Sequence, residues 1–327
     1  MRVAIDVSPL VQTRAGTARY LKGLLRELRH RDGVEVSSRS FGRGDRLSTL
    51  VRDSVWYPFL VGRAEAADVL HCPTYRGPVR PPRVPLVVTV HDLAVLRHPG
   101  AFNRWTREYS PRVVPRVLRA AREVIAVSEF TRRELVELLG VSEEKIHVVP
   151  NAVEDEFTED GPAEQGEYVL AVGTLEPRKN LARLVEAVRR TDTELRIVGA
   201  RGWGRVEVDS NGVRWLGEVS DAELARLYRG AVCVAYPSLY EGFGIPVLEA
   251  MACGAPVVTT RGTAMEEVAD GAAVLVDAQD PAEIAAGIFQ AVADRAQLVA
   301  RGLERAREFR WDAVAAATMD VYREAIA

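Results

Sequence analysis

The chain has 327 residues, of which 47% are hydrophobic and 27% are charged, and its formal net charge is −3. This composition is typical of a soluble globular protein with room for two domains, and no apolar run approaches the ~20 residues that a membrane-spanning helix needs. Asp6 follows the start too closely for a signal-peptide core, and three scattered cysteines exclude a disulfide framework, so we expect Cys72, Cys233 and Cys253 to be buried thiols in a reducing cytoplasm.

The first half of the chain alternates short apolar runs with longer amphipathic stretches. Apolar residues recur at helical spacing over residues 17–30, and Ser128 is a suitable N-cap for a helix over residues 129–139. The polar residues 37–49 are predicted to be a loop. Strands are predicted at residues 3–7, 34–36, 69–71, 86–90, 124–127 and 146–149.

Residues 104–122 have a helical composition that two prolines interrupt. Pro111 and Pro115 are expected to kink or divide this helix, because each removes a backbone hydrogen bond. The arginines of the stretch, together with Trp105 and Tyr109, are compatible with a helix on an anionic membrane and equally with a solvated helix face.

The second half repeats the alternation after an acidic stretch, residues 154–167, that contains Gly and Pro and is the linker candidate. Residues 311–327 are amphipathic and are predicted to form a helix that packs across one of the domains. Strands are predicted at residues 168–172, 195–198, 213–216, 231–236, 256–259 and 273–276, and helices at residues 181–189, 221–228, 246–253 and 281–293.

Strands that alternate with helices imply parallel sheets with right-handed crossovers. We therefore predict an α/β fold of two Rossmann-like, doubly wound domains that face each other across a ligand cleft. The predicted domains are residues 1–157 and 158–310, and the C-terminal helix 311–327 is expected to pack back on the first of them.

Charge is distributed unevenly between the two halves. Residues 1–150 carry 25 Lys and Arg against 16 Asp and Glu, a balance of +9, whereas residues 151–327 carry 18 against 30, a balance of −12. Two domains with different partners would produce this asymmetry, and a basic first half favours an anionic membrane surface or an anionic acceptor. An arginine-rich composition set by the genome is the alternative. Nucleic acid is not expected, because no binding motif accompanies the charge.

The stretch from Glu241 to Glu249 is a strand-to-helix turn with an acid at each end. Gly242 and Gly244 leave room for a ligand close to the backbone, and Pro246 suits the first turn of the helix that follows. The N–H groups of that helix start favour a phosphate. The stretch therefore suggests a site for a sugar diphosphate, and a surface turn with two solvated glutamates is the alternative.

Polar residues also follow three other predicted strands, where ligands bind in such folds. A loop that includes Gly16 follows the first strand, and His91 with Asp92 follows strand 86–90. Arg178 and Lys179 follow strand 168–172, and two adjacent cations suit a diphosphate. A structural histidine and a solvated pair of cations are the alternatives.

Together these segments resemble retaining glycosyltransferases of family 4, and especially their bacterial mannosyltransferase-type members. The most specific part is the E-x7-E signature of Glu241 and Glu249 in EGFGIPVLEAMACGAPVV. The segments TVHDL, AVSEFTRREL, VPNAV and GTLEPRKNL also resemble the family and occur in its order. The resemblance spans nearly the whole chain and implies the GT-B fold.

The resemblance also implies roles for the second domain. Lys179 and Arg178 would hold the donor diphosphate and stabilise the charge on the leaving group. Glu249 would bind the ribose of the donor, and Glu241 with the backbone at Phe243 would bind hydroxyls of the transferred sugar. Family members often carry an arginine at the position of Thr174, and Arg178 replaces that arginine here. The predicted binding set is completed by Thr174, by Gly244 and Ile245, and by the base pocket of Gly217, Glu218 and Val219.

In the first domain, the resemblance places His91 beside the reacting carbon and gives Gly16 the role of leaving room for the diphosphate. The implied reaction moves a sugar from a nucleotide-sugar, with GDP-mannose before UDP-sugars, to a hydroxyl of a glycan, glycolipid or natural product. The product would have an α linkage, and the enzyme would work in the cytoplasm or on the inner membrane surface. The nucleotide-sugar is a co-substrate, and no other cofactor is expected.

Retention is expected to follow same-face attack, in which the departing phosphate takes the proton of the acceptor, rather than a covalent intermediate. Metal-independent transfer is expected, because no Asp-x-Asp serves the donor and Arg178 and Lys179 supply positive charge. The alternatives are a nucleotide-sugar epimerase of the same architecture and a non-catalytic sugar-nucleotide-binding subunit.

Overall fold

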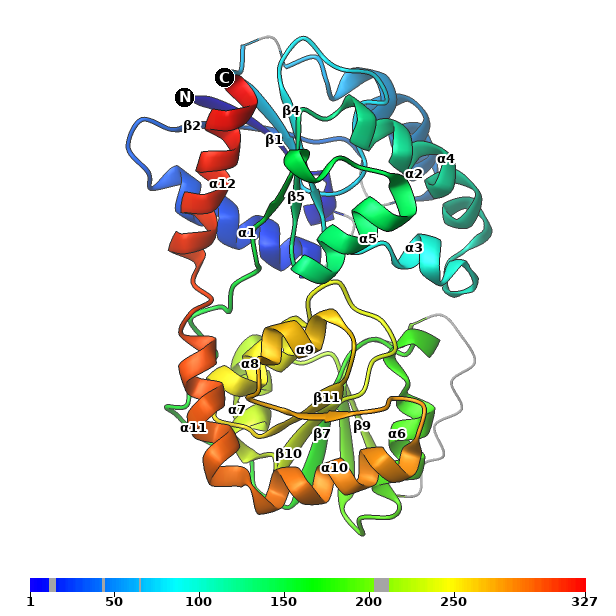
Figure 1. Cartoon of the computed structure of the whole chain (residues 1–327), viewed down its shortest axis with the longest axis vertical. Coiled ribbons are helices and arrows are strands. Elements are labelled where there is room, and N and C mark those ends of the chain that lie inside the picture. Colours follow the sequence, from blue (N-terminus) through cyan, green and yellow to red (C-terminus); the bar gives the residue numbers. More distant parts are fainter. Residues whose placement is uncertain (12–15, 43–44, 65, 203–211) are drawn as a thin grey trace. The chain divides into compact units, whose positions relative to one another are not determined.

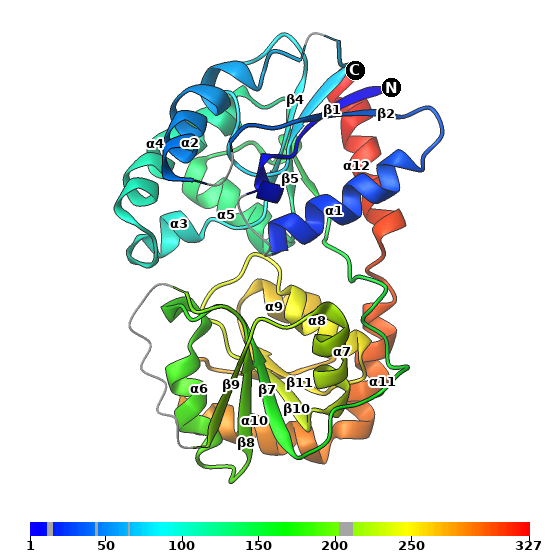
Figure 2. The ribbon, with the colours of Figure 1, turned by 180° about the vertical axis from the view of Figure 1, so that it is seen from behind.

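The computed structural model of the chain divides into two units, residues 1–152 with residues 310–327, and residues 153–309. It describes residues 1–11, 16–42, 45–64, 66–202 and 212–327 (Figures 1 and 2). The sequence places the domain boundaries after residues 157 and 310. Within the described residues, no helix has the length and apolarity that crossing a lipid bilayer requires.

The first unit is built on a parallel sheet with the strand order β2-β1-β3-β4-β5-β6. The chain reverses its direction of winding between β1 and β3, which is the switch point of this sheet. The two strands β3 and β4 are buried along their whole length, which explains their nearly continuous apolar sequence. The strands are β1 (Arg2–Asp6), β2 (Glu35–Arg39), β3 (Val69–Cys72), β4 (Leu86–Val90), β5 (Glu123–Ala126) and β6 (Ile146–Val148).

Helices cover both faces of this sheet. Ser128 caps α5 as predicted, because its side chain accepts a hydrogen bond from the Thr131 backbone N–H at 3.0 Å. The helical segments are η1 (Ser8–Val11), α1 (Gly16–Arg29), α2 (Arg46–Val51), the π-helix η2 (Arg52–Leu60), α3 (Ala94–Arg97), η3 (Pro99–Ala101), α4 (Arg104–Ala120), α5 (Glu129–Leu139), η4 (Glu143–Lys145) and α12 (Trp311–Ile326).

Two predictions for this unit differ from the structure. Helix α4 is not divided at Pro111 or Pro115, because its buried residues Val114 and Val117 pack into the core and offset the lost hydrogen bonds, while a kink at these prolines stays a prediction. Residues 37–49 are not one loop, since β2 extends to Arg39 and α2 begins at Arg46. The sequence hides this part of β2 because it is an edge strand with mostly exposed, polar side chains.

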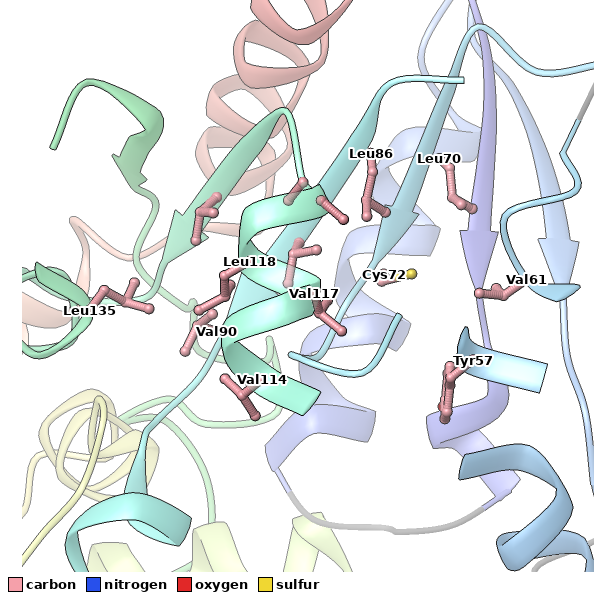
Figure 3. Close-up of a cluster of buried hydrophobic side chains, with 14 of the residues drawn as sticks. Tyr57, Val61, Leu70, Cys72, Leu86, Val90, Val114, Val117, Leu118 and Leu135 are labelled. Atoms are coloured by element: carbon pink, nitrogen blue, oxygen red, sulfur yellow. The ribbon is translucent and has the colours of Figure 1, made fainter. Parts of the chain in front are cut away.

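One core of the first unit lies between the sheet and α4. Figure 3 shows Leu86 and Val90 of β4 next to Val117 of α4, while Tyr57 and Val61 reach the same core from the segment of η2. Cys72 also belongs to this cluster, and all three cysteines are buried and free, as predicted.

The other face of the sheet is covered by α1 and α12. Residues of α12, among them Trp311 and Tyr322, share a buried cluster with Tyr20 and Leu24 of α1. The two helices approach closely at Gly23, where a Cβ atom would lie 2.3 Å from the ring of Trp311. A helix that follows residues 153–309 in the chain thus completes the core of the first unit.

The second unit is also a parallel sheet, with the order β12-β11-β10-β7-β8-β9 and its switch point between β7 and β10. Its strands, all of which were predicted, are β7 (Tyr168–Val172), β8 (Glu194–Val198), β9 (Val213–Gly217), β10 (Cys233–Tyr236), β11 (Val257–Thr260) and β12 (Val274–Val276). Its helical segments are η5 (Pro177–Lys179), α6 (Leu181–Val188), α7 (Asp221–Gly230), α8 (Ile245–Ala252), α9 (Ala264–Ala269), α10 (Pro281–Ala293) and α11 (Arg295–Ala306), of which η5, α9 and α11 were not predicted.

Candidate functional site

The switch point of the second sheet brings together two predicted groups of residues. Strands β7 and β10 are hydrogen-bonded neighbours, so the segments that follow their carboxyl ends meet there. The segment after β7 contains Thr174 and η5, which supplies Arg178 and Lys179. The segment after β10 supplies Glu241.

Glu241 forms an ion pair with each of the two cations. Its Oε1 lies 2.6 Å from Lys179 Nζ, and its Oε2 lies 2.6 Å from Arg178 Nη1. Arg178 Nη2 also lies 2.9 Å from Oε1 of a second acid, Glu176. Two acids and two bases alternate in this group, which we name the charge cluster, and their formal charges cancel. Each of the four side chains is between 9% and 13% exposed, so the cluster is largely shielded from water.

Two hydroxyl groups complete the surroundings of Glu241. Ser238 Oγ donates to Glu241 Oε1 at 2.7 Å and Tyr236 OH donates to the same oxygen at 3.0 Å, while Lys179 Nζ donates to Tyr236 OH at 2.5 Å. Burial alone would raise the pKa of Glu241, but Lys179 and Arg178 outweigh it and lower that pKa to about 2. Glu241 is therefore a carboxylate at neutral pH.

The start of α8 lies directly after Glu241 in the chain. Gly244 precedes the helix with φ of 104°, a conformation that favours glycine, and a Cβ atom there would lie 2.8 Å from Met265 Cγ. Ile245 begins the helix, and Phe243 is buried against Phe309 with ring centroids 5.8 Å apart. The turn therefore has the tight backbone that the sequence predicts.

Glu249, one turn into α8, is also buried, with 2% of its surface exposed. Its Oε2 accepts a hydrogen bond from Tyr228 OH at 2.9 Å. Since Glu241 is only 9% exposed, the alternative of a surface turn with two solvated glutamates is excluded. The predicted base pocket lies further along the sheet: Gly217 ends β9, which β8 separates from β7, and Glu218 and Val219 follow it.

The first unit holds the other predicted residues. Gly16 is the first residue of α1, and residues 14 and 15 of its loop lie outside the described part of the chain. His91 follows β4, and its Nε2 lies 3.0 Å from the Pro73 carbonyl oxygen, so this nitrogen carries the proton. Burial lowers the pKa of His91 to about 4, although the bond to Pro73 opposes the shift. His91 is thus neutral at pH 7.

A buried polar chain lies beneath His91. The ring of His91 meets the ring of Tyr20 edge-on, with centroids 4.8 Å apart. Tyr20 OH lies 3.1 Å from Thr89 Oγ1, Thr89 Oγ1 lies 2.8 Å from His71 Nε2, and His71 Nδ1 lies 2.7 Å from Tyr322 OH of α12. These four residues are fully buried, and burial lowers the pKa of His71 to about 3.

Several residues of the site are missed by the sequence analysis. Glu176, Tyr236 and Ser238 complete the charge cluster or its surroundings, and Tyr228 holds Glu249. Glu176 stands two residues before Arg178 in the segment GTLEPRKNL, so its position near the cations could have been predicted from the sequence. The roles of the Tyr228 and Tyr236 hydroxyls could not, because both tyrosines fit an apolar pattern.

The charge cluster is suited to bind an anion that replaces the carboxylates as partner of the two cations. Arg178 and Lys179 are held in place by carboxylates, which a diphosphate can replace as the partner of both cations. Within the described residues, no group of three or more His, Cys, Asp or Glu side chains is arranged to hold a metal ion.

Two family models match the chain. Residues 14–157 match the model described as "Glycosyltransferase Family 4", and residues 153–309 match the model described as "Glycosyl transferases group 1". The two matches meet where the two units of the structure divide.

Relatives with known names are similar over most of the chain. It is 33% identical to an O-antigen chain mannosyltransferase B of Escherichia coli over 284 residues, which cover 78% of this chain and 74% of the relative. It is 31% identical to an MMP alpha-(1->4)-mannosyltransferase of Mycolicibacterium hassiacum over 313 residues, with coverages of 82% and 73%.

Solved structures share the fold at low sequence identity. A sucrose-phosphate synthase from Thermosynechococcus elongatus matches with a TM-score of 0.76 and 20% identity over 99% of this chain and 98% of its own. HepE from Anabaena, solved in complex with UDP and glucose, matches with a TM-score of 0.75 and 19% identity over 99% of this chain and 100% of its own.

Proposed function

Because this chain belongs to the glycosyltransferases of family 4, we propose that it moves a sugar from a nucleotide-sugar to an acceptor hydroxyl with retention of configuration. Both sheets have the doubly wound, parallel topology expected of the GT-B fold, and the structural neighbours include glycosyltransferases of that fold. Nothing supports the epimerase alternative, since both family models describe glycosyltransferases.

The charge cluster at the switch point of β7 and β10 is the observation that carries the proposal. In the proposed reaction, the donor diphosphate takes the place of Glu241 as the partner of Lys179 and Arg178. These cations then stabilise the charge that grows on the leaving nucleoside diphosphate. Glu241, released from its ion pairs, accepts hydrogen bonds from hydroxyls of the transferred sugar.

The roles of Glu249 and His91 are part of the same proposal. The hydrogen bond from Tyr228 orients the carboxylate of Glu249, and the proposed ligand of this carboxylate is the ribose of the donor. His91 positions the transferred sugar as a neutral imidazole, in agreement with its lowered pKa. Gly16, Thr174 and the turn from Phe243 to Ile245 would contact the donor phosphates and sugar, and Gly217, Glu218 and Val219 would contact its base.

GDP-mannose is the first candidate donor, because two of the similar proteins are named mannosyltransferases. UDP-sugars come second, since HepE was solved with UDP and with UDP-glucose. The acceptor would be a glycan, glycolipid or natural product that receives an α-linked sugar. The three buried free thiols suit a reducing compartment such as the cytoplasm.

Retention is proposed to follow same-face attack, in which the departing phosphate takes the proton of the acceptor. In the proposed donor complex, Glu241 accepts hydrogen bonds from hydroxyls of the transferred sugar, so its carboxylate is not expected to attack the anomeric carbon. Mass spectrometry of the protein incubated with donor alone should find no sugar attached to Glu241. A stable glycosyl adduct on this residue would overturn the same-face mechanism.

A thermal-shift experiment tests the donor site without knowledge of the acceptor. At a concentration ~100 times its dissociation constant, GDP or GDP-mannose should stabilise the protein by ~2.7 kcal/mol. Lys179→Ala should lose most of this shift, whereas Lys22→Ala, at an exposed position of α1, should keep it. If neither guanosine nor uridine nucleotides change the melting temperature, the proposed function is wrong.

Metal-independent transfer is also proposed, on the basis of Arg178 and Lys179 as the groups that neutralise the diphosphate. Donor turnover should therefore continue in excess EDTA at nearly the rate measured without it. A loss of turnover in EDTA that Mg²⁺ or Mn²⁺ restores would contradict the proposal.

A further inference from the structure

Asn180 stands directly after Lys179 of the charge cluster and joins the 3-10 helix η5 to helix α6. Its backbone N–H donates to the Pro177 carbonyl oxygen at 3.1 Å, and its own carbonyl oxygen accepts from the Leu184 N–H at 3.2 Å. Asn180 therefore closes η5 and also begins the hydrogen bonding of α6.

The backbone of Asn180 has a left-handed conformation, with φ of 58° and ψ of 28°. Most side chains adopt this conformation only at a cost in free energy, which is lowest for glycine, asparagine and aspartate. Among the residues other than glycine that the structure describes, Asp192 and Asp270 also have a positive φ, of 55° and 41°. Such a conformation persists where the surrounding structure holds it in place.

The side-chain amide of Asn180 is buried and hydrogen-bonded on both sides. The residue is 4% exposed, and its Nδ2 donates to the Pro237 carbonyl oxygen at 3.1 Å and to the Ala278 carbonyl oxygen at 2.6 Å. Its Oδ1 accepts from Arg183 Nη1 at 3.0 Å. These partners fix the orientation of the amide, because the carbonyl oxygens need a donor and the guanidinium needs an acceptor.

The two carbonyl partners of Asn180 belong to other strand ends of the same sheet. Pro237 directly follows β10, and Ala278 lies in the loop after β12. Strand β12 is separated from β10 by β11, and β7, which leads to η5, pairs with the other side of β10. The amide therefore connects η5 to two loops at the carboxyl edge of the sheet.

Arg178 is attached to the loop that follows β10 by its backbone as well as by its side chain. The carbonyl oxygen of Arg178 accepts from the Leu239 N–H at 2.8 Å and from Ser238 Oγ at 3.3 Å. Its Nη1 donates to the Tyr240 carbonyl oxygen at 3.0 Å. Glu241 follows in the same loop, so these contacts and the amide of Asn180 together set where the cations lie relative to Glu241.

Lys179 has little room to move. A Cβ atom at Gly173 would lie 3.2 Å from Lys179 Cδ, so the stem of Lys179 lies against the backbone of Gly173. Its Nζ lies 2.6 Å from Glu241 Oε1. The position of the ammonium group thus depends on the backbone from which the stem begins, and Asn180 holds the next residue of that backbone.

We propose that Asn180 is a positioning residue for the diphosphate of the donor. Its left-handed backbone and its amide hold Arg178 and Lys179 where they meet Glu241 in the free protein and the phosphates in the donor complex. Asn180 acts through these cations, because both N–H groups of its amide are used by carbonyl oxygens and neither is left for a phosphate. The inference rests on the proposed function, which makes the diphosphate the ligand of the two cations.

Asn180→Gly tests the amide separately from the backbone, because glycine adopts the left-handed conformation readily. Isothermal titration calorimetry should compare GDP with guanosine and UDP with uridine. For the base that the protein binds, we expect the affinity for the diphosphate to fall roughly tenfold, since the cations are less well preorganised. The affinity for the nucleoside, which has no phosphate, should stay unchanged. A variant that is only less stable would keep the ratio of the two affinities.

Two further variants isolate the donating N–H groups. Asn180→Asp keeps the tolerance for the left-handed backbone but places an oxygen against the carbonyls of Pro237 and Ala278. It should weaken binding of the diphosphate at least as much as Asn180→Gly does. The matched control is Asp192→Gly, at an exposed left-handed position of the same unit, and it should bind the diphosphate as the unmodified protein does.

A double-mutant cycle shows whether Asn180 acts through Lys179. In the Lys179→Ala background, Asn180→Gly should weaken diphosphate binding clearly less than it does alone, because one of the cations that it positions is gone.

Additive effects in this cycle, or an equal loss for the nucleoside and the diphosphate, would overturn the positioning role. If Asn180→Gly keeps the preference of the unmodified protein for the diphosphate, the positioning role is wrong and the proposed function stands. If the unmodified protein itself binds neither diphosphate more tightly than its nucleoside, the proposed function fails and this inference fails with it.

Discussion

Glu241 is held by two cations and two hydroxyls inside a small volume with little water. Such an arrangement is costly to assemble, because each charge loses hydration, and it is stable only while every partner is present. Glu241 therefore has a structural role in addition to the role in donor binding that we propose for it. The structural role can be measured separately, as the stability of the protein in the absence of donor.

Glu241→Gln should destabilise the second unit by about 3 kcal/mol, because Arg178 and Lys179 stay buried with one negative charge fewer. The lowered pKa adds a pH dependence: the charged form of Glu241 stabilises the fold above pH ~4.5, and this contribution is lost as pH falls towards 2. Calorimetry between pH 5 and pH 3 should show a steeper loss of stability in the unmodified protein than in the variant. Equal slopes of stability against pH in the two proteins would mean that the ion pairs of Glu241 contribute little. The control is Glu218→Gln, which changes an exposed acid and should keep the slope of the unmodified protein.

The site was only partly predictable at the scale of residues. The E-x7-E spacing and the cation pair led to the prediction that Glu241, Glu249, Arg178 and Lys179 bind one ligand. Glu241 contacts Arg178 and Lys179 because β7 pairs with β10. This pairing joins segments that are far apart in the sequence, so no local sequence pattern predicts it. A pattern of charges also does not tell which charges are buried, and burial decides the pKa of Glu241.

At the scale of elements, α1 and α12 provide the sharpest packing constraint. A methyl group at Gly23 would overlap the ring of Trp311, so Gly23→Ala should displace α12 from α1 at a cost of roughly 1–3 kcal/mol. Gly100→Ala is the matched control, since a Cβ atom there meets no atom within 4 Å. Thermal unfolding of the two variants measures the difference. Equal melting temperatures would show that the indole of Trp311 moves aside without cost.

Elements were predictable wherever burial produced a regular pattern. The buried strands such as β4 and β7 and the amphipathic helix α1 have such a pattern, and they were found with bounds close to those observed. The segment of α2 and η2 was missed for a physical reason: Leu47, Val55 and Phe59 are exposed to solvent, whereas Arg52 and Asp53 are buried. Pattern analysis assumes that apolar residues are buried and charged residues are exposed, so it does not detect a helix of this kind.

At the scale of the whole molecule, the two units differ in their response to acid. All five histidines of the chain precede residue 150, so residues 153–309 contain none. Burial keeps His71 and His91 neutral in the fold, with pKa values of about 3 and 4, whereas an unfolded chain takes up these protons near pH 6.5. The first unit therefore loses stability as pH falls below ~6.5.

Between pH 7 and pH 5, each of these two histidines should cost the first unit about 2 kcal/mol of folding free energy. Calorimetry should resolve two unfolding transitions, of which one shifts strongly to lower temperature over this range. The transition of the second unit should move much less, because Glu241 titrates only below pH ~4.5. The exposed His30→Gln is a control that should leave both transitions in place. Parallel shifts of the two transitions would contradict this assignment.

The position of α12 in the first unit also determines the order in which the protein can form during translation. Residues 153–309 are complete before the ribosome has made Trp311, so the second unit can fold on the nascent chain. The first unit, although its residues 1–152 are made before the second unit, still lacks the helix that covers Tyr20 and Leu24. We expect it to remain open until α12 emerges from the exit tunnel, so that residues 1–152, which are made before the second unit, reach their final packing after it.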